Sequence, residues 1–247
     1  MDLRAFLGRI EASGQLVRVT RPVTVEHEIA AVIRALRGRP VLFERVGDHR
    51  IPVVSNLCAT RELVCLGIGA ERKDLYRRLA AAIAEPRPPE VVAATDYREV
   101  EPDLSHLPIV TYYPGDGGPY ITSGIAAAND AEHGLNLSYH RSLVRSKREL
   151  VLRVVERHLH AYMQRGLDRF ALCIGNSVSV MVAAAISVEL GKSEIDVANA
   201  LGETRLVELQ GKMVPQSEIV LFCRFTGERA AEGPFVDQTE TYDIVRQ

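Results

Sequence analysis

The chain has 247 residues, of which 47% are hydrophobic and 25% charged, with a formal net charge of −2. This length and composition are those of an ordinary globular protein, large enough for two domains of roughly 100–150 residues. The near-neutral charge argues against a broad nucleic-acid-binding face, which needs a clear excess of basic residues. The longest apolar run, at 178–188, is too short to span a bilayer.

The first residues (MDLR) lack the basic and then apolar pattern of a signal peptide. The four cysteines are scattered, lie in apolar surroundings and form no Cys-x-x-Cys pair: Cys58, Cys65, Cys173 and Cys223. Buried thiols in a reducing compartment fit this distribution better than disulfides or a zinc site. We therefore expect a cytoplasmic protein that neither binds nucleic acid nor crosses a membrane.

The first part of the chain has the pattern of a small α/β unit. Apolar residues at helical spacing predict helices, and short β-branched runs predict strands between them. The predicted helices cover 3–13, 26–37, 60–66 and 73–84, and the predicted strands cover 16–19, 41–43 and 51–54. Because this part contains no cluster of catalytic residue types, we expect it to have a structural or interfacial role.

Two loop-rich segments follow, at 85–90 (EPRPPE) and at 103–119. Prolines end the preceding helix and stiffen the connection to the second domain. We place the domain boundary between these segments. The prediction is an N-terminal α/β domain over residues 1–100 and a second domain over residues 101–247.

The second domain begins with strands that follow one another directly, which indicates an antiparallel sheet or barrel. An α/β insertion follows, and the chain then returns to strand. The predicted strands are 121–128, 135–144, 149–155, 170–174, 204–209 and 218–225, and the predicted helices are 158–165, 179–190 and 194–201. The predicted fold is therefore α+β, with a barrel-like second domain.

Two acids flank a turn near the end of the chain, in the stretch EGPFVD at 232–237. The Gly-Pro pair constrains the backbone, so Glu232 and Asp237 can face one cavity if the residues between them pack inward. Two close carboxylates disfavour being ionised together, which allows one of them to carry a proton near neutral pH. The alternative is a surface turn with two solvated acids.

A second informative stretch is NLSYHR at 136–141. On a strand, Asn136, Ser138 and His140 share one face, and Arg141 lies on the other face unless a bulge turns it. Arg141 would then offer a permanent cation to a carboxylate. The alternative is an Arg141 that pairs with a surface acid.

A third group supplies oxygen and nitrogen ligands. Asn136, a histidine of the stretch RHLH at 157–160 and Glu194 offer ligand types suited to Mn²⁺ or Mg²⁺, with a phosphate completing the coordination shell. His160 is an alternative to His158, and histidines at helix starts are more often caps or surface residues. Glu194 also fits a first-turn residue that the helix dipole favours.

These motifs occur in one order: Asn-x-Ser-x-x-Arg at 136–141, Arg-His at 157–158, a helix-opening Glu at 194, and Glu-Gly-Pro-Phe-x-Asp at 232–237, preceded by Pro-x-Ser-Glu-Ile-Val at 215–220. In this combination the chain resembles the UbiD family of reversible decarboxylases, which use prenylated FMN. The resemblance covers nearly the whole chain. It implies a split-β-barrel flavin-binding domain with an α/β insertion after the small N-terminal domain.

The resemblance also implies roles for single residues. Asn136, His158 and Glu194 would hold a metal ion, usually Mn²⁺ with a monovalent ion such as K⁺ beside it, which anchors the flavin phosphate. The residues at cofactor-binding positions are Thr122, Asn136, Ser138, Arg141, Arg157 and His158. The catalytic group would be Arg141, Glu232 and Asp237, where Asp237 takes a place that some members give to Glu.

The implied reaction removes CO₂ from an aromatic or α,β-unsaturated carboxylic acid, which makes the protein a carboxy-lyase. Loss of a carboxylate from an sp² carbon leaves an unstable carbanion, so the modified flavin must accept the electrons. Arg141 would orient the carboxylate, Glu232 would return a proton to the carbon, and Asp237 would tune both. A conventional flavin reductase is a weaker alternative, because it gives no reason for the paired acids.

The expected partners are a small carboxylic acid substrate, a flavin prenyltransferase that supplies the cofactor, and a further protein chain. Members of the family generally continue into a C-terminal α/β domain that helps form the dimer, whereas this chain ends at Gln247. We therefore expect a homo-oligomer or a partner chain that supplies this domain. The alternative function is a non-catalytic flavin-phosphate-binding or assembly subunit of a split decarboxylase.

Overall fold

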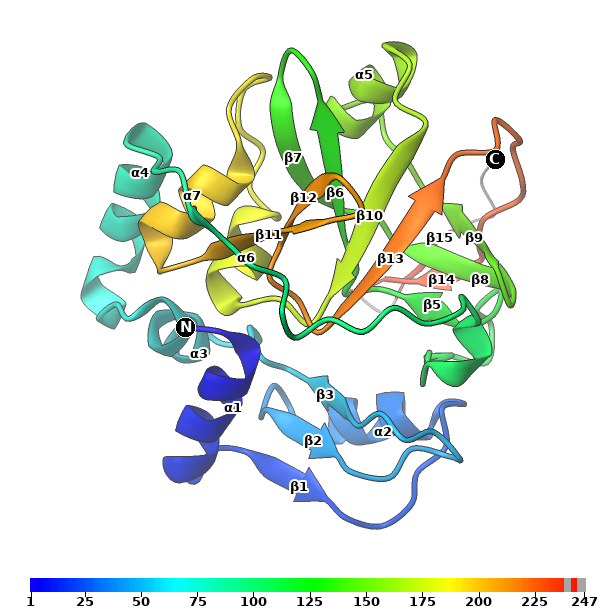
Figure 1. The fold of residues 1–247 in the computed structure, drawn as a ribbon. Coiled ribbons are helices and arrows are strands. Elements are labelled where there is room, and N and C mark those ends of the chain that lie inside the picture. Colours follow the sequence, from blue (N-terminus) through cyan, green and yellow to red (C-terminus); the bar gives the residue numbers. More distant parts are fainter. Residues whose placement is uncertain (238–240, 244–247) are drawn as a thin grey trace.

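The N-terminal part of the chain pairs three short strands and packs helices beside them (Figure 1). The computed structural model describes residues 1–237 and 241–243. Strands β1 (Val17–Val19) and β2 (Val41–Phe43) run parallel, and β3 (Val53–Ser55) joins β2 antiparallel. The helices of this part are α1 (Leu3–Ala12), α2 (Glu28–Ala35), α3 (Arg61–Ile68), the 3₁₀ turn η1 (Arg72–Asp74) and α4 (Leu75–Ala84).

These helices and strands agree with the predicted ones, because the features that define them, helix caps and apolar spacing, depend on residues that are close in the sequence. Asp2 caps α1, since its Oδ1 accepts from the N–H of Ala5 at 2.8 Å. Thr60 caps α3 in the same way, through the N–H of Leu63 at 3.2 Å. The apolar face of α1 is buried, as its spacing predicts, with Phe6 at 0% exposure.

Helices from both parts of the chain share one hydrophobic core. Phe6 and Leu63 belong to the same buried cluster as Val178 and Ile195. Helix α3 packs on α6 (Val178–Ala183), and α4 packs on α7 (Glu194–Leu201). The N-terminal part is therefore joined to the later elements by buried apolar surface, which stabilises their relative placement.

The proline-rich segment leads into a strand that the sequence did not predict. Strand β4 (Glu90–Val92) pairs in parallel with β11 (Arg205–Leu209), and β12 (Lys212–Pro215) pairs antiparallel on the other side of β11. Residues 90–92 thus belong to a sheet made with later strands. The domain boundary after residue 100 stays a prediction.

The second part of the chain is organised around an antiparallel sheet in the order β13-β10-β6-β7, with a smaller sheet β5-β8-β9 and the pair β14-β15 beside it (Figure 1). These strands are β5 (Tyr120–Ile121), β6 (Ile125–Asp130), β7 (Gly134–Tyr139), β8 (Ser142–Ser146), β9 (Glu149–Leu152), β10 (Arg169–Ile174), β13 (Ile219–Arg224), β14 (Phe235–Val236) and β15 (Tyr242–Asp243). The remaining elements are η2 (Leu104–His106) and α5 (His158–Gln164). The mixed α and β architecture is confirmed, and no sheet of the described residues closes into a complete barrel.

The strand predicted over 135–144 is wrong, because the structure contains two strands there. Strand β7 ends at Tyr139 in the central sheet, and β8 begins at Ser142 in the smaller sheet. His140 and Arg141 form the corner between them. A pattern of apolar residues does not reveal this corner, since both strands carry the same alternation.

Two further predicted elements differ in length. The strand predicted over 121–128 is divided at residues 122–124, where a Cβ on Gly124 would lie 2.8 Å from the Leu172 side chain. The helix predicted over 179–190 ends at Ala183. In both segments small residues fit several backbone conformations, so tertiary packing overrides the local pattern.

All four cysteines are unpaired, as predicted. Cys65 and Cys173 are buried and Cys223 is half-buried, whereas Cys58 is exposed, so the prediction of buried thiols is wrong at that position. Across the described residues, the helices are too short or too polar to cross a membrane.

Candidate active site

Arg141 and Glu232 form a bidentate ion pair. The Nε atom of Arg141 donates to Glu232 Oε1 at 2.9 Å, and its Nη2 atom donates to Oε2 at 2.7 Å. The Tyr120 hydroxyl donates to the same Oε1 at 3.0 Å. The side chains of Arg141 and Glu232 are 13% and 4% exposed. Because a planar guanidinium matches a carboxylate fork, both oxygens of Glu232 are held in place.

Phe235 covers this ion pair. The Cζ atom of Arg141 lies 4.8 Å from the centroid of the Phe235 ring, and the Tyr120 ring centroid lies 4.7 Å from it. A cation over an aromatic face is attracted by the ring, and the ring also keeps water from one side of the pair. The pair therefore sits in a partly apolar environment, where its electrostatic interaction is strengthened.

The Gly-Pro turn that precedes Phe235 contains a cis peptide bond between Gly233 and Pro234. It packs against the loop before β5, where the N–H of Gly117 donates to the Pro234 oxygen at 2.8 Å. A Cβ on Gly117 would lie 2.6 Å from the Gly233 oxygen. The close approach of two backbones thus places the acid motif, and it requires glycine at position 117.

The second acid of the motif makes different contacts. The Oδ1 atom of Asp237 accepts from the N–H and the hydroxyl of Thr241, at 3.3 and 3.1 Å. Asp243 approaches the arginine instead: its Oδ2 atom lies 2.9 Å from Arg141 Nη2 and 2.6 Å from Arg153 Nη1. Sequence reasoning missed Asp243 and Arg153, since neither belongs to a recognisable motif.

Asn136, His158 and Glu194 converge on one point from β7, the start of α5 and the start of α7. The Nδ2 atom of Asn136 lies 3.1 Å from Glu194 Oε2 and 3.4 Å from His158 Nδ1, and His158 Nδ1 lies 3.7 Å from Glu194 Oε1. Glu194 is 2% exposed. Burial raises the pKa of Glu194 to about 7 and lowers the pKa of His158, because it disfavours the charged form of each.

This set of side chains fits a divalent cation. Amide oxygen, imidazole nitrogen and carboxylate oxygen are accepted by Mn²⁺ and Mg²⁺. The amide of Asn136 can present either its oxygen or its nitrogen, since the two ends have nearly the same shape. A cation beside the buried carboxylate of Glu194 would offset the cost of its charge. Within the described residues no group of three or more His, Cys, Asp or Glu side chains could hold a metal, so the set depends on the amide.

Of the remaining predicted cofactor residues, Ser138 contacts this set. The Ser138 Oγ atom lies 3.2 Å from Asn136 Oδ1, and Arg157 is the residue just before α5. The Thr122 hydroxyl lies 2.9 Å from the Tyr112 hydroxyl. His160, the alternative ligand, has its Nε2 atom 3.4 Å from the Gln164 amide of the same helix.

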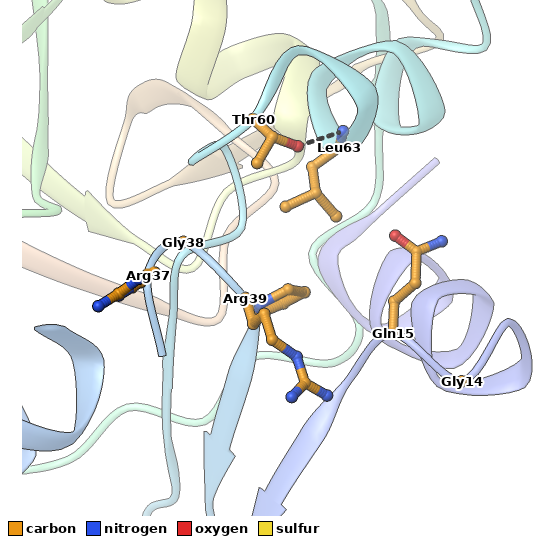
Figure 2. A pocket seen from close by; sticks show the side chains of 8 residues that line it. Gly14, Gln15, Arg37, Gly38, Arg39, Thr60 and Leu63 are labelled. Atoms are coloured by element: carbon orange, nitrogen blue, oxygen red, sulfur yellow. Dashed lines mark hydrogen bonds between the residues drawn. The ribbon is translucent and has the colours of Figure 1, made fainter. Parts of the chain in front are cut away.

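An open cleft of about 300 Å³ lies elsewhere, between the end of α1, the end of α2 and the start of α3 (Figure 2). Its lining includes Gln15, Arg37, Arg39 and Thr60. No residue of the predicted catalytic or metal set lines this cleft, so it is separate from the candidate site.

The chain matches two sequence models of one family. Residues 7–83 match the 3-octaprenyl-4-hydroxybenzoate carboxy-lyase N-terminal domain, and residues 85–247 match the Rift-related domain of the same carboxy-lyase, UbiD. One relative is the anhydromevalonate phosphate decarboxylase of Methanothermobacter thermautotrophicus, which is 37% identical over 99% of this chain. The chain spans 60% of the length of that relative.

Solved structures agree with this similarity. The UbiD-class enzyme HmfF from Pelotomaculum thermopropionicum, in complex with FMN, is 33% identical, with a TM-score of 0.93 over 100% of this chain and 60% of its own. An evolved dimeric form of HmfF contains prFMN. The vanillic acid decarboxylase of Sedimentibacter hydroxybenzoicus is 26% identical, with a TM-score of 0.90 over 99% of this chain and 59% of its own. These similarities, together with the order of the motifs, show that the chain belongs to the UbiD family.

Proposed function

We propose that the chain forms the N-terminal and flavin-binding part of a prenylated-FMN-dependent decarboxylase, a carboxy-lyase that removes CO₂ from an aromatic or α,β-unsaturated acid. The observation that carries this proposal is the buried pair of Arg141 and Glu232. Arg141 of this pair and the proposed metal ligand Asn136 come from one short stretch of the chain, 136–141. A carboxylate-binding cation and a cofactor anchor are therefore only five positions apart in the sequence.

Asn136, His158 and Glu194 would hold Mn²⁺ or Mg²⁺, with K⁺ beside it, and the metal would bind the flavin phosphate. Thr122, Ser138 and Arg157 are the further contacts in this proposal. The FMN and prFMN in the two HmfF structures support the choice of cofactor. When bound, the prenylated flavin supplies the electron sink that the departing carboxylate requires.

The residues of this chain would bind the substrate and move the proton. Arg141 offers its guanidinium to the substrate carboxylate and orients it. Glu232, which Tyr120 and Arg141 hold in a fixed position, would take up a proton from solvent and deliver it to the carbon that loses CO₂. Asp237 completes the proposed catalytic group as the acid that tunes the other two.

For the substrate we infer a small unsaturated acid. Several relatives at 33–37% identity carry the name anhydromevalonate phosphate decarboxylase. This makes anhydromevalonate phosphate the first compound to test, and vanillic acid is the aromatic comparison. We also propose a cytoplasmic location, a flavin prenyltransferase as the cofactor source, and assembly as a homo-oligomer or with a partner chain.

The test uses the full chain reconstituted with Mn²⁺, K⁺ and prenylated FMN. CO₂ release and exchange of solvent deuterium into the product are measured with both compounds. We expect Glu232→Gln to lower the exchange rate by about 10²- to 10⁴-fold, the contribution of a general acid. The matched control is Glu228→Gln, which changes an exposed acid. Unchanged exchange in Glu232→Gln would show that the catalytic assignment is wrong.

The second candidate is the non-catalytic flavin-phosphate-binding or assembly subunit. A wild-type chain that binds the flavin, yet neither releases CO₂ nor exchanges deuterium, supports this candidate over the enzyme.

A further inference from the structure

A chain of polar contacts connects the corner at His140 to the proposed metal ligand Asn136. His140 Nδ1 lies 3.0 Å from the backbone oxygen of Arg153, and His140 Nε2 lies 3.0 Å from Ser138 Oγ. Ser138 Oγ lies in turn 3.2 Å from Asn136 Oδ1. His140 is 5% exposed, and none of the proposed steps uses it.

The hydrogen-bonding capacity of each group fixes the direction of these contacts. A backbone oxygen only accepts, so the Nδ1 atom of His140 must carry a proton. In the neutral imidazole Nε2 is then an acceptor. The hydroxyl of Ser138 must give its single proton to Nε2, and it has none left for Asn136.

We propose that His140 is a positioning residue that acts through Ser138 to set the amide of Asn136 for a divalent cation. Since Ser138 Oγ can only accept on the side of Asn136, the amide satisfies it by presenting its NH₂ group. The amide oxygen then faces His158 and Glu194. This inference rests on the ligand set of the proposed function.

The opposite orientation of the amide leaves one group unsatisfied. If Asn136 presents its oxygen to Ser138, the single hydroxyl proton faces two acceptors, Asn136 Oδ1 and His140 Nε2. One of these buried acceptors then lacks a partner, which is unfavourable. His140 therefore biases the amide towards the orientation that serves a metal.

In that orientation a cation is needed. The Asn136 atom that faces the ligand set lies 3.1 Å from Glu194 Oε2 and 3.4 Å from His158 Nδ1. With oxygen at that position, an ionised Glu194 and a His158 unprotonated at Nδ1, three lone-pair donors meet, and a cation between them removes their repulsion. The contact with His140 thus favours the metal-bound state of the chain over the metal-free state.

The test measures Mn²⁺ affinity of the full chain in the presence of FMN, from the electron paramagnetic resonance signal of unbound Mn²⁺. His140→Phe keeps a ring and removes both nitrogen atoms. We expect the affinity for Mn²⁺ to fall by about 10- to 100-fold, the usual effect of losing a partner of a metal ligand. The control is His106→Phe at an exposed position, which should bind as the wild type does.

A double variant distinguishes positioning from lost packing. In His140→Phe the hydroxyl of Ser138 turns to Asn136 Oδ1 and holds the amide in the wrong orientation. Adding Ser138→Ala removes that hydroxyl, so we expect most of the lost Mn²⁺ affinity to return when Mn²⁺ binding is measured without FMN, which Ser138 itself is proposed to contact. A packing defect would instead make the losses additive, and additive losses would overturn the proposal.

The tautomer of His140 provides a measurement on the wild type itself, which covers the case in which His140→Phe does not fold. Nitrogen-15 chemical shifts should show the proton on Nδ1, and a proton on Nε2 would overturn the proposal. If the wild type fails to bind Mn²⁺ and FMN, the ligand set of the proposed function is wrong and this inference falls with it. If the wild type binds and His140→Phe binds equally well, this inference alone is wrong.

Discussion

Arg141 and Glu232 lie 91 positions apart in the sequence and share two hydrogen bonds, of 2.9 and 2.7 Å, at a corner between two sheets. The hydrogen bonds of such a bidentate pair are short and directional because both partners are charged and planar. It connects the strand corner at 140–141 to the Gly-Pro turn near the end of the described chain.

Removing one partner of this pair should destabilise the chain. Glu232→Ala leaves the buried Arg141 guanidinium with fewer acceptors, and losing one partner of a buried pair costs about 3–5 kcal/mol. Because Asp243 still contacts Arg141, we expect a value near the lower limit. Urea unfolding followed by circular dichroism measures the change.

The control for this prediction is Glu218→Ala, which breaks the exposed pair with Arg4. Exposed pairs contribute little, since water and salt screen them. Equal changes in the free energy of unfolding for the two variants would contradict the role assigned to the buried pair.

Gly117→Ala should displace the acid motif. The new Cβ would lie 2.6 Å from the Gly233 oxygen, and neither backbone can move without shifting the turn that holds Glu232. We expect a lower melting temperature together with weaker substrate binding, both relative to the wild type.

The matched control is Gly8→Ala, where a Cβ meets nothing within 4 Å in helix α1. Alanine favours the helix over glycine by about 1 kcal/mol, so this variant should be slightly more stable than the wild type. A Gly117→Ala chain as stable as Gly8→Ala would show that the close approach is unimportant.

The stability of the metal-free chain should depend on pH through Glu194. Burial raises the pKa of its carboxyl from 4.5 to about 7, so the folded state binds the proton more tightly than the unfolded state does. The contribution of Glu194 to the free energy of unfolding is then greatest below pH 4.5. It falls by about 3 kcal/mol in total as the pH rises to 7. Urea unfolding at several pH values in this range, without metal, measures the slope of the free energy of unfolding against pH.

Glu194→Gln should remove that part of the slope, because glutamine does not titrate. Glu189→Gln, at an exposed neighbouring position, should keep it. The same slope in the Glu194→Gln and wild-type chains would contradict the prediction.

Removal of the metal should weaken flavin binding. If Asn136, His158 and Glu194 hold a cation that contacts the flavin phosphate, a chelator should lower FMN affinity in the wild type, as measured by flavin fluorescence. Glu194→Ala should bind FMN weakly with or without the chelator, whereas Glu189→Ala should respond as the wild type does. FMN binding that ignores the chelator in all three chains would argue against a metal anchor.

The sequence by itself determined the helices and strands of the N-terminal part, the residue types of the candidate site and the family resemblance. Helix caps such as Asp2 and Thr60, apolar spacing and the Gly-Pro turn depend on neighbours in the chain, so they can be read without a fold. The choice of Asn136, His158 and Glu194 as a set came from the resemblance, and the structure brings these three side chains together.

Only the tertiary structure decided where the chain turns and which charges meet. The corner at 140–141, the pairing of β4 with β11 and the contact of Asp243 with Arg141 all join segments that are distant in sequence. Local patterns carry no information about such distances, because the sheets can pack in more than one way until buried side chains and backbone contacts select one arrangement.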